Sequence, residues 1–331
     1  MSSVPVLYHA EASFYSQRAR LSFAEKGIKY KSHVINLMAG EVHEEWFLRK
    51  INPKGQVPAM EHQGQFYRDS CDIIEYVDTL PSNKPKLCPD DSSDMSKKVG
   101  YYREKLESIN VFAVSFGSLY HRHLTVNALA PNFISKDSIK ERFTAVGKNL
   151  TSLQEKSPDL VAGLSERKGN TDIIFDEEKV IAILNDVDGI LGEIEEELQK
   201  QKAYFGDAEY WLCGKTFTIA DIYLSCLLHR LTFVGQAERL FLSKRPLVTD
   251  YYNRVLLRKS FRKECVYANN MFWSMFMPML RAKVKKARPF LFVVSAIAIG
   301  VIAYYKKEEI IDLGNEMFVK FRSLFPEVDT D

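Results

Sequence analysis

Asn52 to Ser70 read NPKGQVPAMEHQGQFYRDS, a proline-containing loop followed by a hairpin pattern. Val57 to Met60 and Gln65 to Tyr67 are short strand-like runs, and the Gln63-Gly64 pair between them is a tight-turn signal. The segment therefore predicts a β-hairpin that the chain enters through residues 52–58.

Strand and helix patterns continue on both sides of this hairpin. Gly27 is placed to end the first helix, and the last helix starts at Ser70 and stops before Pro81. The other predicted elements are strands at Val4–Tyr8 and Lys31–Asn36 and helices at Ser13–Lys26 and Glu41–Lys50. The order β-α-β-α-β-β-α is that of an α/β thioredoxin-like domain, which we place at residues 1–81.

The strand pattern disappears from about residue 92, so residues 92–265 are predicted to form an all-α domain. Apolar residues recur at helical spacing from Val99 to Leu119 and from Ile181 to Leu198, and each run predicts one amphipathic helix. The carboxylates of the second run are expected to form a solvated face: Glu193, Glu195, Glu196 and Glu197.

Two further features belong to the helical domain. The polar stretch at about 135–176, which contains Pro158 and Gly163, is interpreted as a partly helical insertion. Thr218-Ile219-Ala220-Asp221 has the pattern of a capping box, in which the Thr218 hydroxyl accepts the amide three residues on and the Asp221 carboxylate reaches back to the cap amide. This motif is assigned a structural role, the start of a buried helix.

Composition bounds the classes of function. The chain has 331 residues, 46% of them hydrophobic, which is enough for about two domains. Its formal net charge is only +2, so nucleic acid is not an expected partner. The five cysteines form no C-x-x-C pair and indicate reduced thiols in the cytosol. His121 and His123 are expected to point in different directions from one helix, and no metal site is predicted.

Pro289 to Tyr305 read PFLFVVSAIAIGVIAYY, a run without a charge. A helix of this length covers roughly 25 Å at 1.5 Å per residue. Basic residues flank the run on both sides, and Tyr304 and Tyr305 stand where interfacial aromatic residues are expected. Residues 289–305 are therefore predicted to be a transmembrane helix. The alternatives are a buried core helix and a hairpin or interfacial helix.

The position of this span favours a tail anchor. Only 26 residues follow Tyr305, so the span would insert after translation and leave the preceding domains in the cytosol. Residues 306–331 are expected to be a short acidic tail. A short span between basic flanks favours the mitochondrial outer membrane, with the peroxisomal membrane as a second destination.

These pieces in this order resemble the glutathione transferase superfamily. The run LYHAEASFYSQRARLSFAEKGIKY has the S-x-x-S-x-R-x-R and A-x-K-G-I-x-Y spacing of the zeta class. Residues 52–58 are similar to the N-P-x-x-x-V-P loop of the superfamily, and Asp69-Ser70 to its acidic residue and serine before the third helix. The resemblance implies that glutathione is bound by Gln56, Val57, Pro58, Asp69 and Ser70.

Each of these positions has a physical rationale. A cis Pro58 would present the backbone of Val57 to the peptide of glutathione, and Ser70 at a helix N-terminus would offer amides to the γ-glutamyl carboxylate. A hydroxyl at Ser13 would donate to the thiol sulfur and lower the pKa of that thiol. Alternatively, Ser13 and Ser70 are helix N-caps, each worth about 1 kcal/mol.

A closer resemblance is to the ganglioside-induced-differentiation-associated protein 1 family. The runs WLCGKTFTIADIYLSCLLHRLTFVG and KRPLVTDYYNRVLLRKSF carry it. Members of that family are similar to transferases but have an insertion in the helical domain and a C-terminal anchor in the mitochondrial outer membrane. The resemblance implies a role in mitochondrial dynamics, namely fission and network shape, and is compatible with a homodimer.

Two hypotheses about activity stay open. Phe14 and Tyr15 replace a serine and a cysteine of the zeta pattern, so they either narrow the thiol pocket or create an apolar cleft for a hydrophobic ligand. In the first hypothesis the chain is an adaptor or redox sensor. In the second it is an active glutathione transferase that conjugates glutathione to hydrophobic electrophiles, with Ser13 as the catalytic residue. Glutathione is then a ligand or substrate, and no cofactor is predicted.

Overall fold

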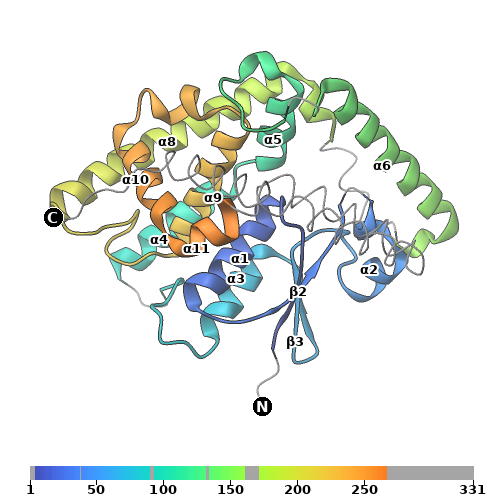
Figure 1. Ribbon diagram of the computed structural model, residues 1–331, viewed down its shortest axis with the longest axis horizontal. Coiled ribbons are helices and arrows are strands. Elements are labelled where there is room, and N and C mark those ends of the chain that lie inside the picture. The colour runs from blue at the N-terminus through green and yellow to red at the C-terminus, as the bar shows by residue number, and fades with distance from the viewer. Residues whose placement is uncertain (1–3, 38, 90–92, 132–133, 161–170, 267–331) are drawn as a thin grey trace, which may run out of the picture. The chain divides into compact units, whose positions relative to one another are not determined.

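A computed structural model describes residues 4–37, 39–89, 93–131, 134–160 and 171–266. The first part of the chain forms a four-stranded sheet with helices on both faces (Figure 1). Its elements are β1 (Val6–His9), α1 (Phe14–Lys26), β2 (Lys31–Val34), η1 (Glu41–His43), α2 (Glu45–Lys50), β3 (Ala59–His62), β4 (Gln65–Tyr67) and α3 (Ser70–Thr79). The predicted order of strands and helices is confirmed.

The sheet has the strand order β2-β1-β3-β4, with β1 parallel to β2 and antiparallel to β3. Side chains alternate between the two faces of a strand, so Leu7 and Met60 pack with Phe23 of α1, whereas Ala59 packs with Phe47 of α2. Figure 1 shows α1 and α3 together, and α2 on the other side of the strands.

The predicted hairpin between β3 and β4 is present and turns at Gln63 and Gly64. Both residues have positive φ angles, 54° and 78°, which is the backbone that a two-residue hairpin turn needs. The turn sets the register that pairs Met60 with Tyr67 and His62 with Gln65.

The rest of the described chain is helical, and α9 lies at its centre. Nearly every residue of α9 is buried, and this helix packs against α1, α4, α5 and α10. The elements are α4 (Asp94–Glu107), α5 (Val111–Tyr120), η2 (Arg122–Leu124), α6 (Lys136–Lys156), η3 (Pro158–Leu160), η5 (Asp172–Phe175), α8 (Glu177–Phe205), α9 (Ile219–Phe233), η6 (Glu238–Leu242), α10 (Pro246–Leu257), α11 (Lys259–Phe261) and η7 (Arg262–Val266).

The single long helix predicted across residues 99–119 is wrong, because the chain forms two helices there. α4 ends at Glu107, and Asn110 caps α5 by accepting the amide of Ala113 at 3.0 Å. An asparagine side chain that bonds the backbone locally favours a cap over a helix interior. The apolar spacing continues through the break and hides it in the sequence.

The predicted insertion is helical over most of its described part. Ile139 and Phe143 of α6 pack beside α5 and η5, against Phe112, Phe116 and Phe175. Leu150 and Leu153, farther along α6, pack against Leu48 of α2. Figure 1 shows α6 extending from the region of α5 to the region of α2. The insertion therefore connects the helical domain to the far face of the sheet.

The expected solvated carboxylate face of α8 is wrong for most of its members. Glu197 is buried and binds Lys98 of α4 at 2.5 Å, and Glu193 pairs with Lys105. Glu195 accepts the first amides of α10, those of Leu247 and Val248, at 3.0 and 2.8 Å. These carboxylates join α8 to its neighbours, and Glu196 is the exposed one.

Within the described ranges, none of the helices combines the length and the apolar character required to span a bilayer. The predicted transmembrane helix at 289–305 and the acidic tail at 306–331 lie outside the described residues.

Candidate functional site

Ser13 closes the loop after β1 and caps α1. Its hydroxyl accepts the amide of Ser16 at 3.3 Å, with an extended backbone (φ −73°, ψ 124°) that is typical of an N-cap. A hydroxyl that accepts one hydrogen bond keeps its own proton for another acceptor. The half-buried Ser13 can therefore cap the helix and still donate to a ligand.

Two buried arginines hold the loop in front of Ser13. Arg20 donates to the carbonyl oxygens of Ala10 and Glu11 at 3.2 and 3.0 Å. Arg230 of α9 donates to the carbonyl oxygen of Ala12 at 2.8 Å. Three successive carbonyl groups are thus fixed by guanidinium groups, one of which belongs to the helical domain.

Phe14 is buried, which argues against this ring as the lining of an open apolar cleft. Its side chain is buried in the main core with Tyr223 of α9, and the Arg18 guanidinium lies 4.4 Å from the Phe14 ring centre and 3.7 Å from that of Tyr223. Arg18 is 1% exposed and forms an ion pair with Glu107 of α4 at 2.6 Å. Sequence reasoning missed the burial of Arg18, because a charged side chain gives no sign of burial in the sequence.

The loop at residues 52–58 is braced by the fully buried Asn52. Its side-chain amide donates to the carbonyl oxygen of Gln56 at 2.9 Å, and its oxygen accepts the amide of Lys54 at 3.1 Å. The peptide bond between Val57 and Pro58 is cis. Within the described part of the chain, the backbone of Val57 forms no hydrogen bond, so it is available to pair with an extended ligand.

The start of α3 supplies the second part of this site. Asp69 caps the helix by accepting the amide of Cys71 at 2.7 Å, so the N-cap is Asp69 and not Ser70. Ser70 is the first helical residue. Its side chain is 2% exposed, and its hydroxyl has no hydrogen-bond partner among the described residues. An unpaired hydroxyl beside free helix amides suits an anionic group, although it is closed to solvent here.

Charges in both parts of the site affect the pKa of Tyr15. Burial raises the pKa of its phenol, Arg18 opposes this increase, and the negative charges of Glu107 and Asp69 add to it. The side chain is nevertheless 36% exposed. Tyr15 therefore lies close enough to the start of α3 to respond to its capping carboxylate, and it reaches the surface where Phe14 does not.

The thiol closest in sequence to this site does not suit thiol chemistry. Cys71 donates to the carboxylate of Glu75 at 3.5 Å, and burial raises the pKa of the Cys71 thiol to about 11. The thiolate is the nucleophilic form, so this cysteine is unreactive near neutral pH.

The expectation that His121 and His123 point in different directions is wrong. Both rings contact Glu177 at the start of α8, at 3.4 Å and 3.0 Å. His121 lies just past the end of α5 and His123 lies in η2, so the helix geometry assumed for the pair does not apply. In the described ranges, no group of three or more histidine, cysteine, aspartate or glutamate side chains could hold a metal ion.

Thr218 and Asp221 make the capping-box contacts that start α9. Asp221 accepts the Thr218 amide at 2.8 Å and the Thr218 hydroxyl at 2.9 Å. It also accepts the amide of Leu212 and the hydroxyl of Tyr251, each at 2.9 Å. Burial raises the pKa of this carboxyl group, against the effect of these hydrogen bonds. The motif therefore organises the helix that carries Tyr223 and Arg230.

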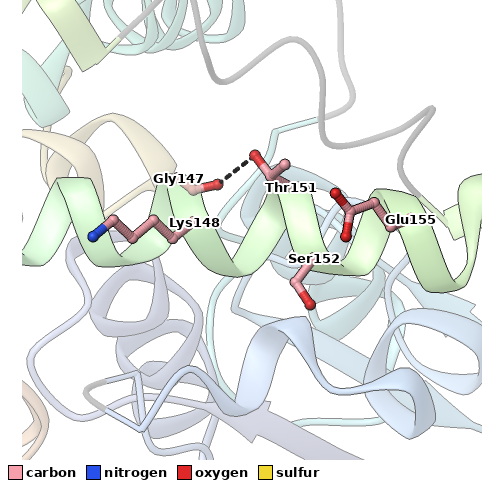
Figure 2. Close-up of a pocket in the computed structure, with 5 residues that line it drawn as sticks. All are labelled: Gly147, Lys148, Thr151, Ser152 and Glu155. Carbon is pink, nitrogen blue, oxygen red and sulfur yellow. Dashed lines mark hydrogen bonds between the residues drawn. The ribbon is translucent and has the colours of Figure 1, made fainter.

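A separate hollow lies along α6 and contains none of the predicted glutathione-binding residues. Figure 2 shows the residues that line it, which all belong to one stretch of this helix: Gly147, Lys148, Thr151, Ser152 and Glu155. Thr151 donates to the carbonyl oxygen of Gly147 at 3.1 Å and is thereby satisfied within the helix. We interpret this as a solvated helix face.

Comparison with known proteins identifies the two domains. Residues 7–85 match the glutathione S-transferase N-terminal domain, and residues 172–254 match the glutathione S-transferase C-terminal domain. In solved structures, the β-etherase LigF from Sphingobium has a TM-score of 0.57 at 21% identity, covering 79% of this chain and 98% of its own. Glutathione transferase F7 from Populus trichocarpa has a TM-score of 0.54 at 18% identity, covering 80% of this chain and all of its own. These likenesses show a glutathione transferase-like fold.

Sequence relatives narrow the family. Glutathione S-transferase TCHQD from Arabidopsis thaliana is 25% identical, over 78% of this chain and 88% of its own length. Ganglioside-induced differentiation-associated protein 1-like 1 from Homo sapiens is 30% identical over 311 residues, covering 91% of this chain and 84% of its own, and the mouse protein of the same name is also 30% identical. The chain belongs to the ganglioside-induced differentiation-associated protein 1 family, which has a glutathione transferase-like fold.

Proposed function

We propose that this protein is a tail-anchored, glutathione transferase-like adaptor or redox sensor of the mitochondrial outer membrane that acts in fission and network shape. The observation that carries the proposal is a difference between two parts of the site. The backbone and helix-end groups that would bind glutathione are available for a ligand, whereas the loop that would activate its thiol is fixed by contacts with the helical domain.

The retained parts are backbone and helix-terminus features. The unpaired backbone of Val57 and the amides at the start of α3 would accept the peptide and carboxylate groups of glutathione. The unpartnered Ser70 hydroxyl would complete the carboxylate contact. These contacts would hold the ligand without contacting its thiol.

The fixed loop favours binding over turnover. The carbonyl groups that precede Ser13 are held by Arg20 and Arg230. Phe14 and Arg18 are packed against Tyr223, so the start of α1 cannot move independently of α9. A ligand-binding adaptor needs no such movement.

The membrane part of the proposal rests on the apolar run at 289–305 with its basic flanks, and on the family to which the chain belongs. Its test is the cellular location of a chain that lacks residues 281–331. We expect this chain to be diffuse in the cytosol while the full chain lies at mitochondria. The same membrane location for both chains would contradict the anchor.

Calorimetry with glutathione on the full chain in detergent micelles tests the site. We expect saturable binding that Ser70→Ala weakens, without measurable conjugation of a hydrophobic electrophile. Ser225→Ala is the matched control, because Ser225 is equally buried but donates to the carbonyl oxygen of Ile222 within α9. No heat at millimolar glutathione would remove glutathione from the proposal.

An active transferase is the second candidate, and the half-buried Ser13 hydroxyl with its unused proton favours it. Conjugation that Ser13→Ala abolishes while glutathione binding persists would establish this activity. Equal conjugation rates in the two proteins would exclude Ser13 from the mechanism.

A further inference from the structure

The chain after α10 forms a short amphipathic segment at the surface. α11 and η7 follow each other without a break, and α11 lies between the end of α10 and α1 (Figure 1). Phe261, Glu264 and Cys265 are buried against the core. Lys259 and Lys263 are exposed, and because they stand four residues apart in helical backbone they share the outer face. The segment therefore has a core-facing side and a basic outer side.

An exposed apolar side chain adjoins these lysines. Leu257 ends α10 and is 71% exposed. Arg258 has an extended backbone (φ −66°, ψ 124°), so the chain turns there from α10 into α11. A single exposed leucine is ordinary on a protein surface, but here it stands at a corner with cations on the next turn. We call Leu257, Lys259, Lys263 and the half-buried Arg262 the corner surface.

Carboxylates close to the corner surface are turned inward and paired. Glu25 of α1 is 10% exposed and binds Arg258 at 2.5 Å. Glu264 is 9% exposed and pairs with the buried Arg20 at 3.5 Å. Lys263 also contacts Glu264 at 3.1 Å, yet the lysine side chain stays 77% exposed. The charge that faces solvent here is therefore positive.

Neighbouring elements do not cancel this charge. Asp250, the acidic residue of α10, is paired with Arg254 in the same helix at 3.1 Å. Lys29 is exposed and follows the last turn of α1, the turn that binds Arg258 through Glu25. A surface with outward lysines, inward carboxylates and one exposed leucine suits a partner that offers many negative charges above an apolar layer.

We infer that the corner surface is a docking site for anionic lipid headgroups on the membrane that carries the chain. Lipid phosphate and carboxylate groups would attract Lys259 and Lys263, and Leu257 would enter the boundary between headgroups and acyl chains. This contact would hold the folded domains in one orientation to the bilayer instead of leaving them free to rotate on a tether. The inference rests on the anchor of the proposed function.

The continuity of the chain favours a lipid surface over a protein partner. Residues 267–288 alone separate η7 from the apolar run at 289–305, and they contain the basic residues that precede that run. A short covalent connection raises the effective concentration of the bilayer at the face where the connection begins. The cations before the span and those of the corner surface have the same sign, so one anionic surface can attract both.

A fluorescent label on the same face tests the docking. The probe is the full chain with Cys71→Ser, Cys88→Ser and Asn253→Cys, labelled at position 253 with an environment-sensitive dye. Asn253 is exposed and precedes Leu257 by one helical turn, so the label reports on the corner surface without replacing its residues. The labelled chain is added from detergent to vesicles of phosphatidylcholine, with or without phosphatidylserine. We expect the emission to shift to the blue, and a lipid-bound quencher to reduce it, only with phosphatidylserine.

Charge reversal and salt separate headgroup attraction from mere proximity. Lys259→Glu with Lys263→Glu, or a high salt concentration, should abolish the shift, since screening removes the attraction between exposed charges. The matched control is Lys97→Glu with Lys179→Glu, whose side chains are 71% and 65% exposed on α4 and α8, and it should keep the shift. A label at Leu129→Cys, another exposed apolar position, should show no shift.

Leu257→Ser should keep the blue shift but reduce quenching by a quencher on the acyl chains, because the leucine is the side chain that enters the apolar boundary. An emission spectrum that is the same with and without phosphatidylserine would overturn the inference. Extraction of the chain from the vesicles by alkaline carbonate reports the anchor separately. A chain that is extracted but still shows the shift would contradict the anchor and keep the corner surface, and a chain that resists extraction without a shift would do the opposite.

Discussion

The carboxylate of Asp221 accepts hydrogen bonds from three separate segments: the amide of Leu212, the amide and hydroxyl of Thr218, and the hydroxyl of Tyr251. No part of this side chain reaches solvent. A buried carboxylate that is fully hydrogen-bonded orders its donors, and none of them has water as a substitute partner.

Replacing Asp221 by asparagine should therefore be costly. In Asp221→Asn, an amide nitrogen faces groups that need an acceptor, and we expect the free energy of unfolding to fall by about 3 kcal/mol. Urea denaturation measures this change. Asp250→Asn is the control, because Asp250 is 58% exposed and pairs with Arg254 in its own helix, so its effect should stay within about 0.5 kcal/mol. A loss in Asp221→Asn no larger than in the control would contradict the role of Asp221.

Two buried histidines make stability depend on pH. Burial, with the charge of Arg230, lowers the pKa of His229 to about 4; burial, with Arg20 and His33, lowers that of His9 to about 3. Below pH 6.5 the unfolded chain binds these protons and the folded chain does not, so the free energy of unfolding decreases as the pH falls from about 6.5 to about 4. Each histidine contributes about 1.4 kcal/mol per pH unit.

Urea denaturation at pH 7, 6 and 5 measures this slope. His229→Gln should make this slope shallower by about 1.4 kcal/mol per pH unit, because it removes one of the two histidines that bind a proton only in the unfolded chain. An unchanged slope would show that His229 is protonated in the folded protein.

At the level of single residues, local motifs could be predicted and distant partners could not. Thr218 and Asp221 are three residues apart, so the sequence alone indicates their contact. Asp69 and Ser70 are both good cap residues, and only the backbone shows that Asp69 is the cap. The isolation of the Ser70 hydroxyl depends on the packing around it, and no local pattern reveals that.

The insertion helix α6 has one apolar stripe that serves two contacts. Its members follow the alternating four- and three-residue spacing of a helix seam: Ile139, Phe143, Val146, Leu150 and Leu153. The N-terminal part of the stripe packs beside α5, and the C-terminal part packs on Leu48 of α2. The ion pair between Arg49 and Asp159, at 2.8 Å, lies at the same contact.

Leu150→Ala should loosen this contact while leaving α6 helical. The change removes the buried side chain that faces Leu48, so we expect faster amide hydrogen exchange in α2 and η3 but unchanged exchange in α8. Lys148→Ala is the matched control on the solvated face of α6 (Figure 2) and should change neither segment. Equal exchange in α2 for both variants would argue against the contact.

At the level of elements, the spacing of apolar residues and the turn-forming residues predicted the strands, the hairpin and most helices. The break between α4 and α5 was missed because Leu106 and Ile109 keep the apolar period across it, while the capping function of Asn110 shows only in its hydrogen bond. The carboxylates of α8 were misassigned for a similar reason. Their partners on α4 and α10 are distant in sequence, and helix periodicity carries no information about them.

At the level of the whole molecule, Arg18 joins the sheet domain to the helical domain. In Arg18→Leu the ion pair with Glu107 and the stacking on Tyr223 are both lost, and we expect the free energy of unfolding to fall by about 3 kcal/mol. Limited proteolysis should also cut the connection between α3 and α4 faster. Arg103→Leu is the control, since its pair with Glu75 also joins α4 to α3 but is more exposed and should be worth less than about 1 kcal/mol. Equal losses in the two variants would exclude a special role for Arg18.

Fold and family could be predicted at this level because several motifs occur together in a fixed order. The loop at 52–58, the Asp69-Ser70 pair and the capping box are each weak alone and specific as a set. The fixed arrangement of the Ser13 loop could not be predicted, because it depends on Arg18 and Arg230, whose burial arises from packing between the two domains.

The position of Arg18 also has a consequence for protein synthesis. Phe14 and Arg18 leave the ribosome before Glu107 and well before Tyr223. Until α9 emerges, the nascent chain presents an uncovered aromatic ring and an unpaired guanidinium, which is the kind of surface that chaperones bind. The sheet domain can acquire its strands while translation continues, but its Ser13 loop is completed only after the last core helices have been made.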